Sequence, residues 1–156
     1  MTIENSLPAL PKPHYTLIET SRGEHPAIVV INSALRRFAG RPLFPWHLKL
    51  DIKCQLLADN GMPTAEETRI LYEFEDRVSA LLEAQRNVIF LSRVTCQGTR
   101  ELSYRVHDPK AANDNLQQLL AESDPIREWE YRMEEDPSWQ LAKAELGLIE
   151  RDPKYS

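Results

Sequence analysis

Along residues 46–134 the hydrophobic positions recur in some segments at every second residue and in others at the spacing of an α-helix. Alternation predicts a half-buried strand, and a stripe with a period of about 3.6 residues predicts an amphipathic helix. The predicted elements, in chain order, are a strand at 46–54, a helix at 64–85, strands at 87–96 and 101–107, a helix at 109–120 and a strand at 128–134.

This order of elements is that of the split β-α-β unit of ferredoxin-like folds. Such a unit has the sheet order 4-1-3-2, with helices on one face and an open face on the other. Residues 15–20 and 27–31 predict an added N-terminal hairpin. Asp136-Pro137 begins a short C-terminal helix, which Gly147 is expected to end. We therefore expect an α+β fold with a ferredoxin-like sheet.

Both long helices begin with capping residues. Thr64 precedes Glu67 by three positions, which is the spacing of a capping box. Asp108 is placed to cap the second helix, and Pro109 follows at a position where its missing N–H costs nothing. The apolar stripe of the first helix includes Phe74, which we expect to pack on the sheet.

The chain is expected to form one domain. Its 156 residues, 42% hydrophobic and 28% charged, suffice for a single core. We place an extended, proline-containing arm at 1–13, the α+β domain at 14–149 and a polar tail at 150–156. No apolar run is long enough to cross a bilayer, and a signal-peptide pattern is absent. Cys54 and Cys96 are expected to be reduced core thiols, so the sequence favours a cytoplasmic protein without a membrane partner.

The net charge of −5 is unevenly distributed. Residues 1–60 hold seven Lys/Arg and five Asp/Glu, whereas residues 122–136 hold seven acids and two arginines. An acidic surface repels phosphate backbones, which makes nucleic acid a poor partner and a basic protein a better one.

The last predicted strand carries the main candidate for partner binding. Alternation places Glu128, Glu130 and Glu134 on one face of what should be an edge strand, and Glu135 and Asp136 follow directly. One hypothesis is that these five residues form an acidic docking surface. The alternative is that the charges only protect the edge from aggregation or pair with lysines of the neighbouring strand. Both alternatives remain open at the sequence level.

Catalytic motifs are missing from the sequence. Ser103 and His107 share a strand face but stand roughly 13 Å apart at about 3.3 Å per residue, too far for a nucleophile and its base. Five glycines form no phosphate loop, and neither Cys-x-x-Cys nor His-Glu-x-x-His occurs. We therefore expect no enzyme activity, no cofactor and no metal.

One arrangement keeps a metal or pH-sensing site open. In the expected strand order, His47 and His107 lie at the same sheet edge, with Glu134 near them on the last strand. Two imidazoles and a carboxylate could hold zinc or respond to pH. The favoured alternative is two solvated surface histidines.

Other conspicuous residues are interpreted structurally. Trp46 and Trp129 fall on the buried phases of their strands. A basic loop contains Arg36, Arg37 and Arg41. Most acids of the first long helix are expected on its solvated side; these are Glu66, Glu67, Glu73, Asp76 and Glu83.

Two segments resemble one bacterial family. They are the run from Asn60-Gly61-Met62-Pro63 to Glu67 with its following helix, and Glu134-Glu135-Asp136-Pro137-Ser138-Trp139. The family is domain-of-unknown-function family number six hundred ninety-five. It resembles the type B protein regulators of ribonuclease E, which are small acidic inhibitors with a similar α+β fold. The likeness covers about two-thirds of the chain but not the arm at 1–13 or the basic loop. It implies a non-enzymatic binding role and transfers no catalytic residue.

The sequence thus favours an acidic, non-enzymatic α+β protein that inhibits or regulates a partner protein, as a toxin immunity protein or a nuclease regulator does. The alternative is a small enzyme or a metal- or ligand-binding protein that uses the open sheet face.

Overall fold

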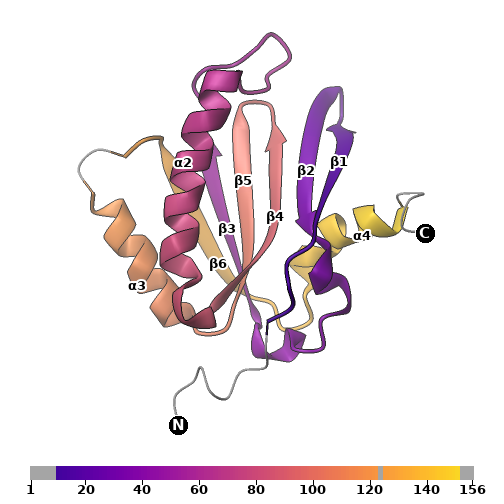
Figure 1. The fold of residues 1–156 in the computed structure, drawn as a ribbon, viewed down its shortest axis with the longest axis vertical. Helices are drawn as coiled ribbons and strands as arrows, with labels where there is room; N and C mark the ends of the chain where they lie inside the picture. Colours follow the sequence, from indigo (N-terminus) through magenta and orange to yellow (C-terminus); the bar gives the residue numbers. More distant parts are fainter. Residues whose placement is uncertain (1–9, 123–124, 152–156) are drawn as a thin grey trace.

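A six-stranded antiparallel sheet forms the centre of the protein (Figure 1). The computed structural model describes residues 10–122 and 125–151. The sheet order is β1-β2-β4-β5-β3-β6. The strands are β1 (Tyr15–Arg22), β2 (His25–Asn32), β3 (Trp46–Lys53), β4 (Val88–Cys96), β5 (Thr99–Val106) and β6 (Trp129–Glu135).

The last four strands take the order β6-β3-β5-β4, which is the order that the sequence predicts. The N-terminal hairpin extends this sheet because β2 pairs with β4. The two edges of the sheet are therefore β1 and β6, far apart in the structure (Figure 1). The fold is α+β.

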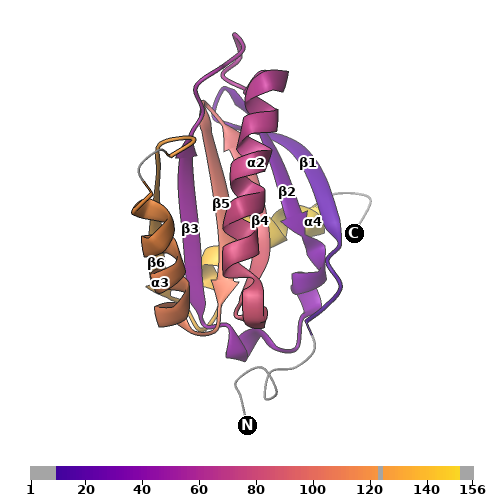
Figure 2. The ribbon, with the colours of Figure 1, turned by 60° about the vertical axis from the view of Figure 1, so that its left-hand side comes forward.

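Two long helices cover one face of the sheet, here called the α2 face (Figures 1 and 2). They are α2 (Ala65–Leu82) and α3 (Pro109–Leu120). Both begin as predicted: the Thr64 hydroxyl accepts from the Glu67 amide at 3.2 Å, and the Asp108 carboxylate caps α3. Phe74 is buried between α2 and the sheet, where its ring centroid lies 5.7 Å from that of Trp129.

The opposite face is not open as expected. A second hydrophobic cluster lies there, formed by β2 and β4 together with short 3-10 helices and α4 (Lys143–Arg151). The 3-10 helices are η1 (Ser33–Arg37), η2 (Arg41–Leu43), η3 (Ala84–Arg86) and η4 (Gln140–Ala142), of which η1 and η4 contribute buried residues to the cluster. In the part of this α4 face around Lys49 and Asp51, both of these charged side chains are partly exposed.

The C-terminal helix also runs further than predicted. Gly147 lies inside α4 and does not end it. Leu146 and Ile149 are buried against the second cluster, so packing sustains the helix across the glycine. Most of the predicted arm and tail, residues 1–9 and 152–156, lies outside the described residues.

The basic loop is an ordered part of this face. Nη2 of Arg41 donates to the carbonyls of Leu35 and Arg36, at 2.9 Å each. The Arg41 guanidinium also lies 4.8 Å from the ring centroid of Trp139, which is buried. Arg41 therefore holds the loop together.

The two cysteines are both free, as expected. Cys96 is buried on β4 and Cys54 is half-buried just beyond β3, and β5 separates these two strands. Within the described residues, no helix is long and apolar enough to span a membrane.

Candidate functional site

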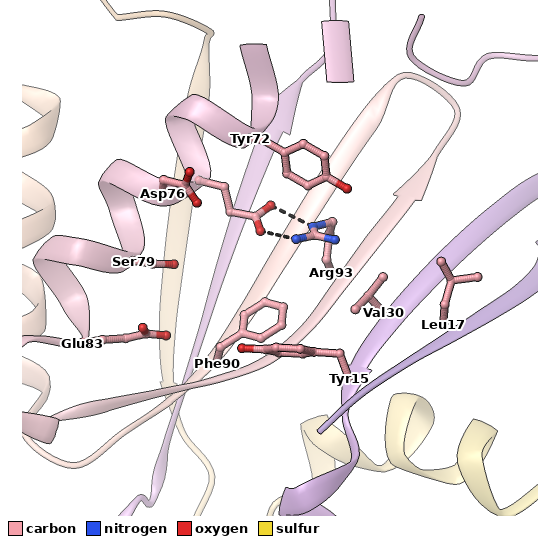
Figure 3. A pocket seen from close by; sticks show the side chains of 10 residues that line it. Tyr15, Leu17, Val30, Tyr72, Asp76, Ser79, Glu83, Phe90 and Arg93 are labelled. Carbon is pink, nitrogen blue, oxygen red and sulfur yellow. Dashed lines mark hydrogen bonds and ion pairs between the residues drawn. The ribbon is translucent and has the colours of Figure 1, made fainter. Parts of the chain in front are cut away.

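A groove of about 560 Å³ separates α2 from the N-terminal hairpin (Figure 3). Tyr15, Leu17 and Val30 form its hairpin side. Phe90 and Arg93 of β4 form the floor. The Tyr15 and Phe90 ring centroids lie 6.0 Å apart, so the two rings close the lower end of the groove.

The helix side of the groove follows from helical spacing. Tyr72, Asp76, Ser79 and Glu83 are separated by four, three and four residues, which places them along one flank of the helix and its C-terminal cap. This flank turns toward the hairpin (Figure 3). The sequence analysis assigned Asp76 and Glu83 to a solvated surface, and both are exposed, but they line a groove.

An ion pair stabilises the upper floor. Nε of Arg93 donates to Glu75 at 2.8 Å, and Nη2 of Arg93 forms a second bond with the same carboxylate. Burial alone would lower the pKa of Arg93, but Glu75 more than offsets this effect and the net shift is upward. The guanidinium carbons of Arg93 and Arg100 lie 5.0 and 5.3 Å from the Tyr72 ring centroid. Glu75 and Arg93 therefore neutralise each other, and Tyr72 is fixed above them.

The lower helix side has hydroxyl and carboxylate groups. The Ser79 and Tyr104 hydroxyl oxygens are 3.2 Å apart. Burial raises the pKa of Tyr104, so this phenol stays protonated at neutral pH and is not a base that could activate Ser79. The walls of the groove partly desolvate Glu83 and thereby raise its pKa. The chemistry of the groove is therefore suited to holding a ligand or a partner side chain.

The acidic residues predicted for partner binding lie on the edge strand β6 or directly before or after it. Glu128, Glu130, Glu134 and Glu135 are exposed. Asp136 does not share this surface: it is buried, and Nη1 of Arg105 donates to its carboxylate at 2.9 Å. Ser123 and Asp124, at the start of the acidic stretch, lie outside the described residues.

The charges across β3 and β6 are only partly complementary. Glu128 pairs with Lys53 at 3.5 Å, which agrees with the alternative that the acids pair with lysines of the neighbouring strand. Glu130, however, stands opposite Asp51. Lys49 pairs with Asp51 and Glu101 rather than with an acid of β6. The residue of β6 that stands opposite Lys49 is Arg132. Like charges directly opposite each other destabilise a sheet, so the pairing of Glu130 with Asp51 does not stabilise this edge.

The two histidines do not form the site considered from the sequence. His47 is buried, not solvated, and its Nδ1 lies 3.2 Å from Nη1 of Arg105. Nδ1 of His107 donates to the Leu43 carbonyl at 2.5 Å. Among residues 10–122 and 125–151, no three His, Cys, Asp or Glu side chains are grouped so that they could hold a metal ion.

Arg105 is fully buried, although it occupies a polar position in the alternating pattern of its strand. Its guanidinium donates to the carbonyls of Phe44 and Asp136 and lies 4.4 Å from the Trp139 ring centroid. Burial alone would raise the pKa of Asp136, but the Leu141 amide and Arg105 hold it below its usual range. The signal in the sequence is the Asp-Pro-x-Trp element after β6, whose Asp136 and Trp139 enclose Arg105. This cluster fixes the C-terminal segment to the sheet.

The burial of Glu67 contradicts a further expectation. It was placed on the solvated side of its helix, but it is fully buried. Nε of Arg127 donates to it at 2.8 Å, and so does the backbone amide of Gln55, also at 2.8 Å. These bonds, above all that of Arg127, lower the pKa of Glu67 to about 2. Glu67 thus joins α2 to two loops instead of contributing to an acidic surface.

Comparison with known proteins identifies one family. The model of a family of unknown function, DUF695, matches residues 16–142. The match includes both long helices and every strand residue except Tyr15, the first residue of β1. It therefore covers the groove residues from Leu17 onward. No curated protein and no solved structure matches the chain.

Proposed function

Because this chain belongs to the DUF695 family, a family of unknown function, its role has to be inferred from its surfaces, and we propose that it is a non-enzymatic, acidic protein-binding module. In this proposal it inhibits or regulates a basic partner protein, as the immunity protein of a toxin or a regulator of a nuclease does. Its docking site is the groove between α2 and the hairpin.

One observation supports this choice of site: the groove combines exposed apolar side chains with acids that lack a partner. Leu17 and Tyr15 are 60% and 59% exposed. Asp76 and Glu83 make no ion pair with any described residue. Exposed aromatic and apolar side chains beside charged groups are typical of a protein interface, where burial by a partner removes the apolar surface from water.

The charge of the groove supports a basic partner. Glu75 is neutralised by Arg93, which leaves Asp76 and Glu83 as the net charge of the lining. The chain as a whole carries a net charge of −5. Complementary charge speeds encounter and makes association depend on salt, so binding should weaken as ionic strength rises.

The acidic β6 surface is a second candidate docking site on the same protein. Glu128, Glu130 and Glu134 are exposed, and the like charges of Glu130 and Asp51 are not explained by edge protection. Replacing the three glutamates by lysine would change the local charge by six without disturbing the core.

Two charge-reversal variants test whether the partner docks at the groove or at the β6 surface. The tagged protein captures its partner from cells of the source organism, and the purified pair is then studied by surface plasmon resonance at several salt concentrations. We expect Asp76→Lys with Glu83→Lys to slow association by at least tenfold. The variant Glu128→Lys, Glu130→Lys, Glu134→Lys should slow association less than the groove variant does, because it changes only the long-range field and not the docking site. The reverse result would move the docking site to β6, and equal rates for all three proteins would refute both sites.

A small-ligand function is the rival, because the groove volume falls within the range of about 300–1,000 Å³ typical of small-molecule sites. Native mass spectrometry of the freshly purified protein distinguishes the two. A bound metabolite that is lost on Phe90→Ala would favour the rival function.

Two finer assignments belong to the same proposal. We assign strands β6-β3-β5-β4 with α2 and α3 to a ferredoxin-like unit, which their order and antiparallel pairing support. We also assign the protein to the cytoplasm, a reducing compartment that suits its two free cysteines.

A further inference from the structure

The helix layer on the α2 face is narrower than the sheet beneath it. Neighbouring strands lie about 4.8 Å apart and packed helices about 8–10 Å apart, so one helix covers about two strands. The sheet has six strands, but of residues 10–122 and 125–151 only α2 and α3 form helices on this face (Figures 1 and 2). The hairpin β1–β2 is the part left without a helix. The uncovered width, two strands, is about that of one further helix.

The uncovered strands present an apolar surface to this space. Leu17 and Tyr15 of β1 are mostly exposed, and Ile28 and Val30 of β2 are half-buried. The register pairs Leu17 with Val30, so these side chains lie on the same face of the hairpin. The strands thus provide the kind of floor on which α2 packs elsewhere in the sheet.

The flank of α2 beside this floor is acidic. Tyr72, Asp76, Ser79 and Glu83 follow one another along about 16 Å of helix, or three turns. Asp76 and Glu83 have no ion-pair partner among the described residues, and Arg93 at the floor is neutralised by Glu75. A helix lying here would contact an apolar floor on one side and carboxylates on another.

We infer that this groove binds an amphipathic helix of the partner protein, which completes the helix layer beside α2. The apolar stripe of that helix rests on Leu17 and Val30, and a row of Lys or Arg residues on its flank faces Asp76 and Glu83. This inference rests on the proposed function, since it specifies what occupies the proposed docking site. Charge complementarity and the width of the uncovered sheet both support a helix of this kind.

Two phage-displayed libraries of 16-residue peptides test the inference on the whole protein. One has an alanine-rich helical framework with randomised surface positions. The other has the same randomised positions but two fixed internal prolines, which prevent a continuous helix. Binders are selected on the wild-type protein, synthesised, and measured by fluorescence anisotropy and circular dichroism.

We expect binders from the helical library, with Lys or Arg enriched on one side of an apolar stripe and helicity that increases on binding. Their affinity should fall at least tenfold with Leu17→Glu and with the pair Asp76→Lys, Glu83→Lys. It should change less than twofold with the control Asp114→Lys, which alters an exposed acid on α3. Thermal melts of every variant verify that it folds.

Four outcomes would overturn the inference. Groove-dependent binders that come from the proline library would indicate an extended partner, which leaves the proposed docking site intact. Helical binders that are insensitive to the groove variants would place the helix elsewhere. The absence of any groove-dependent binder from both libraries would refute the docking site as well. Sedimentation of the protein alone covers the remaining case, because self-association lost in Leu17→Glu would assign the groove to a second copy of this chain.

Discussion

The buried position of His47 should make the protein lose stability in mild acid. The ring is 7% exposed, and its Nδ1 lies 3.2 Å from Nη1 of Arg105. Because an arginine is always a donor, Nδ1 of a neutral His47 accepts this bond. Burial, and next the charge of Arg105, lower the pKa of His47 from 6.5 to about 4, and Asp136 only partly opposes them.

The sign and size of the effect follow from linkage. As the pH falls below 6.5, the unfolded chain binds a proton at this residue while the folded protein does not, so unfolding becomes easier. The stability present at neutral pH is lost between pH 6.5 and about 4. With these two pKa values the loss is about 2 kcal/mol between pH 7 and pH 5, and about 3 kcal/mol by pH 4.

Urea unfolding followed by tryptophan fluorescence measures this loss. The variant His47→Asn keeps an acceptor for Arg105 but does not titrate. The fold also lowers the pKa values of Asp136 and Glu67, so protonation of these carboxylates destabilises the protein in acid. This contribution is the same in the wild type and the variant and cancels when their losses are subtracted. We expect the wild type to lose about 2 kcal/mol more than the variant between pH 7 and pH 5. Equal losses in the two proteins would refute the reasoning, whatever their stabilities at pH 7.

Three further predictions concern the core. Phe74→Ala should lower the free energy of unfolding by about 3–5 kcal/mol in a urea melt, because it leaves a cavity under α2; a loss below about 1 kcal/mol would contradict this packing. Glu67→Gln should cost about 3–5 kcal/mol, since Arg127 would remain buried without its counter-charge, and an unchanged melting temperature would show that the pair is dispensable. Cys54→Ala and Cys96→Ala should both fold, and thiol titration of the denatured, unreduced wild type should find two thiols, whereas none would indicate a disulfide.

The beginnings of the long helices and the identities of the strands could be predicted from short stretches of sequence. Thr64 and Asp108 cap helices through bonds to residues two or three positions away, so the signal and the structure lie in the same few residues. Alternation from 46 to 53 likewise marks a strand, because side chains of a strand point to opposite faces in turn. The order of the last four strands followed from the sequence of elements.

Whether a polar strand face is covered could not be predicted in this way. His47 and Arg105 occupy the polar positions of their alternating strands, which predicts exposure, and yet both side chains are buried. Arg105 is buried because the Phe44 region and Trp139, both distant from it in sequence, fold over that face, and His47 lies beside Arg105. Alternation states which side chains share a face, but it carries no information about what packs on that face.

The groove is likewise a product of the tertiary structure. The helical spacing of Tyr72, Asp76 and Glu83 is present in the sequence, and so are the strand positions of Leu17 and Val30. The groove exists only because β2 pairs with β4, which sets the hairpin beside α2. That pairing joins segments more than sixty residues apart through backbone hydrogen bonds, which any two strand sequences can form. Local sequence thus determined the elements of this protein and the composition of their faces, and long-range strand pairing decided which faces meet.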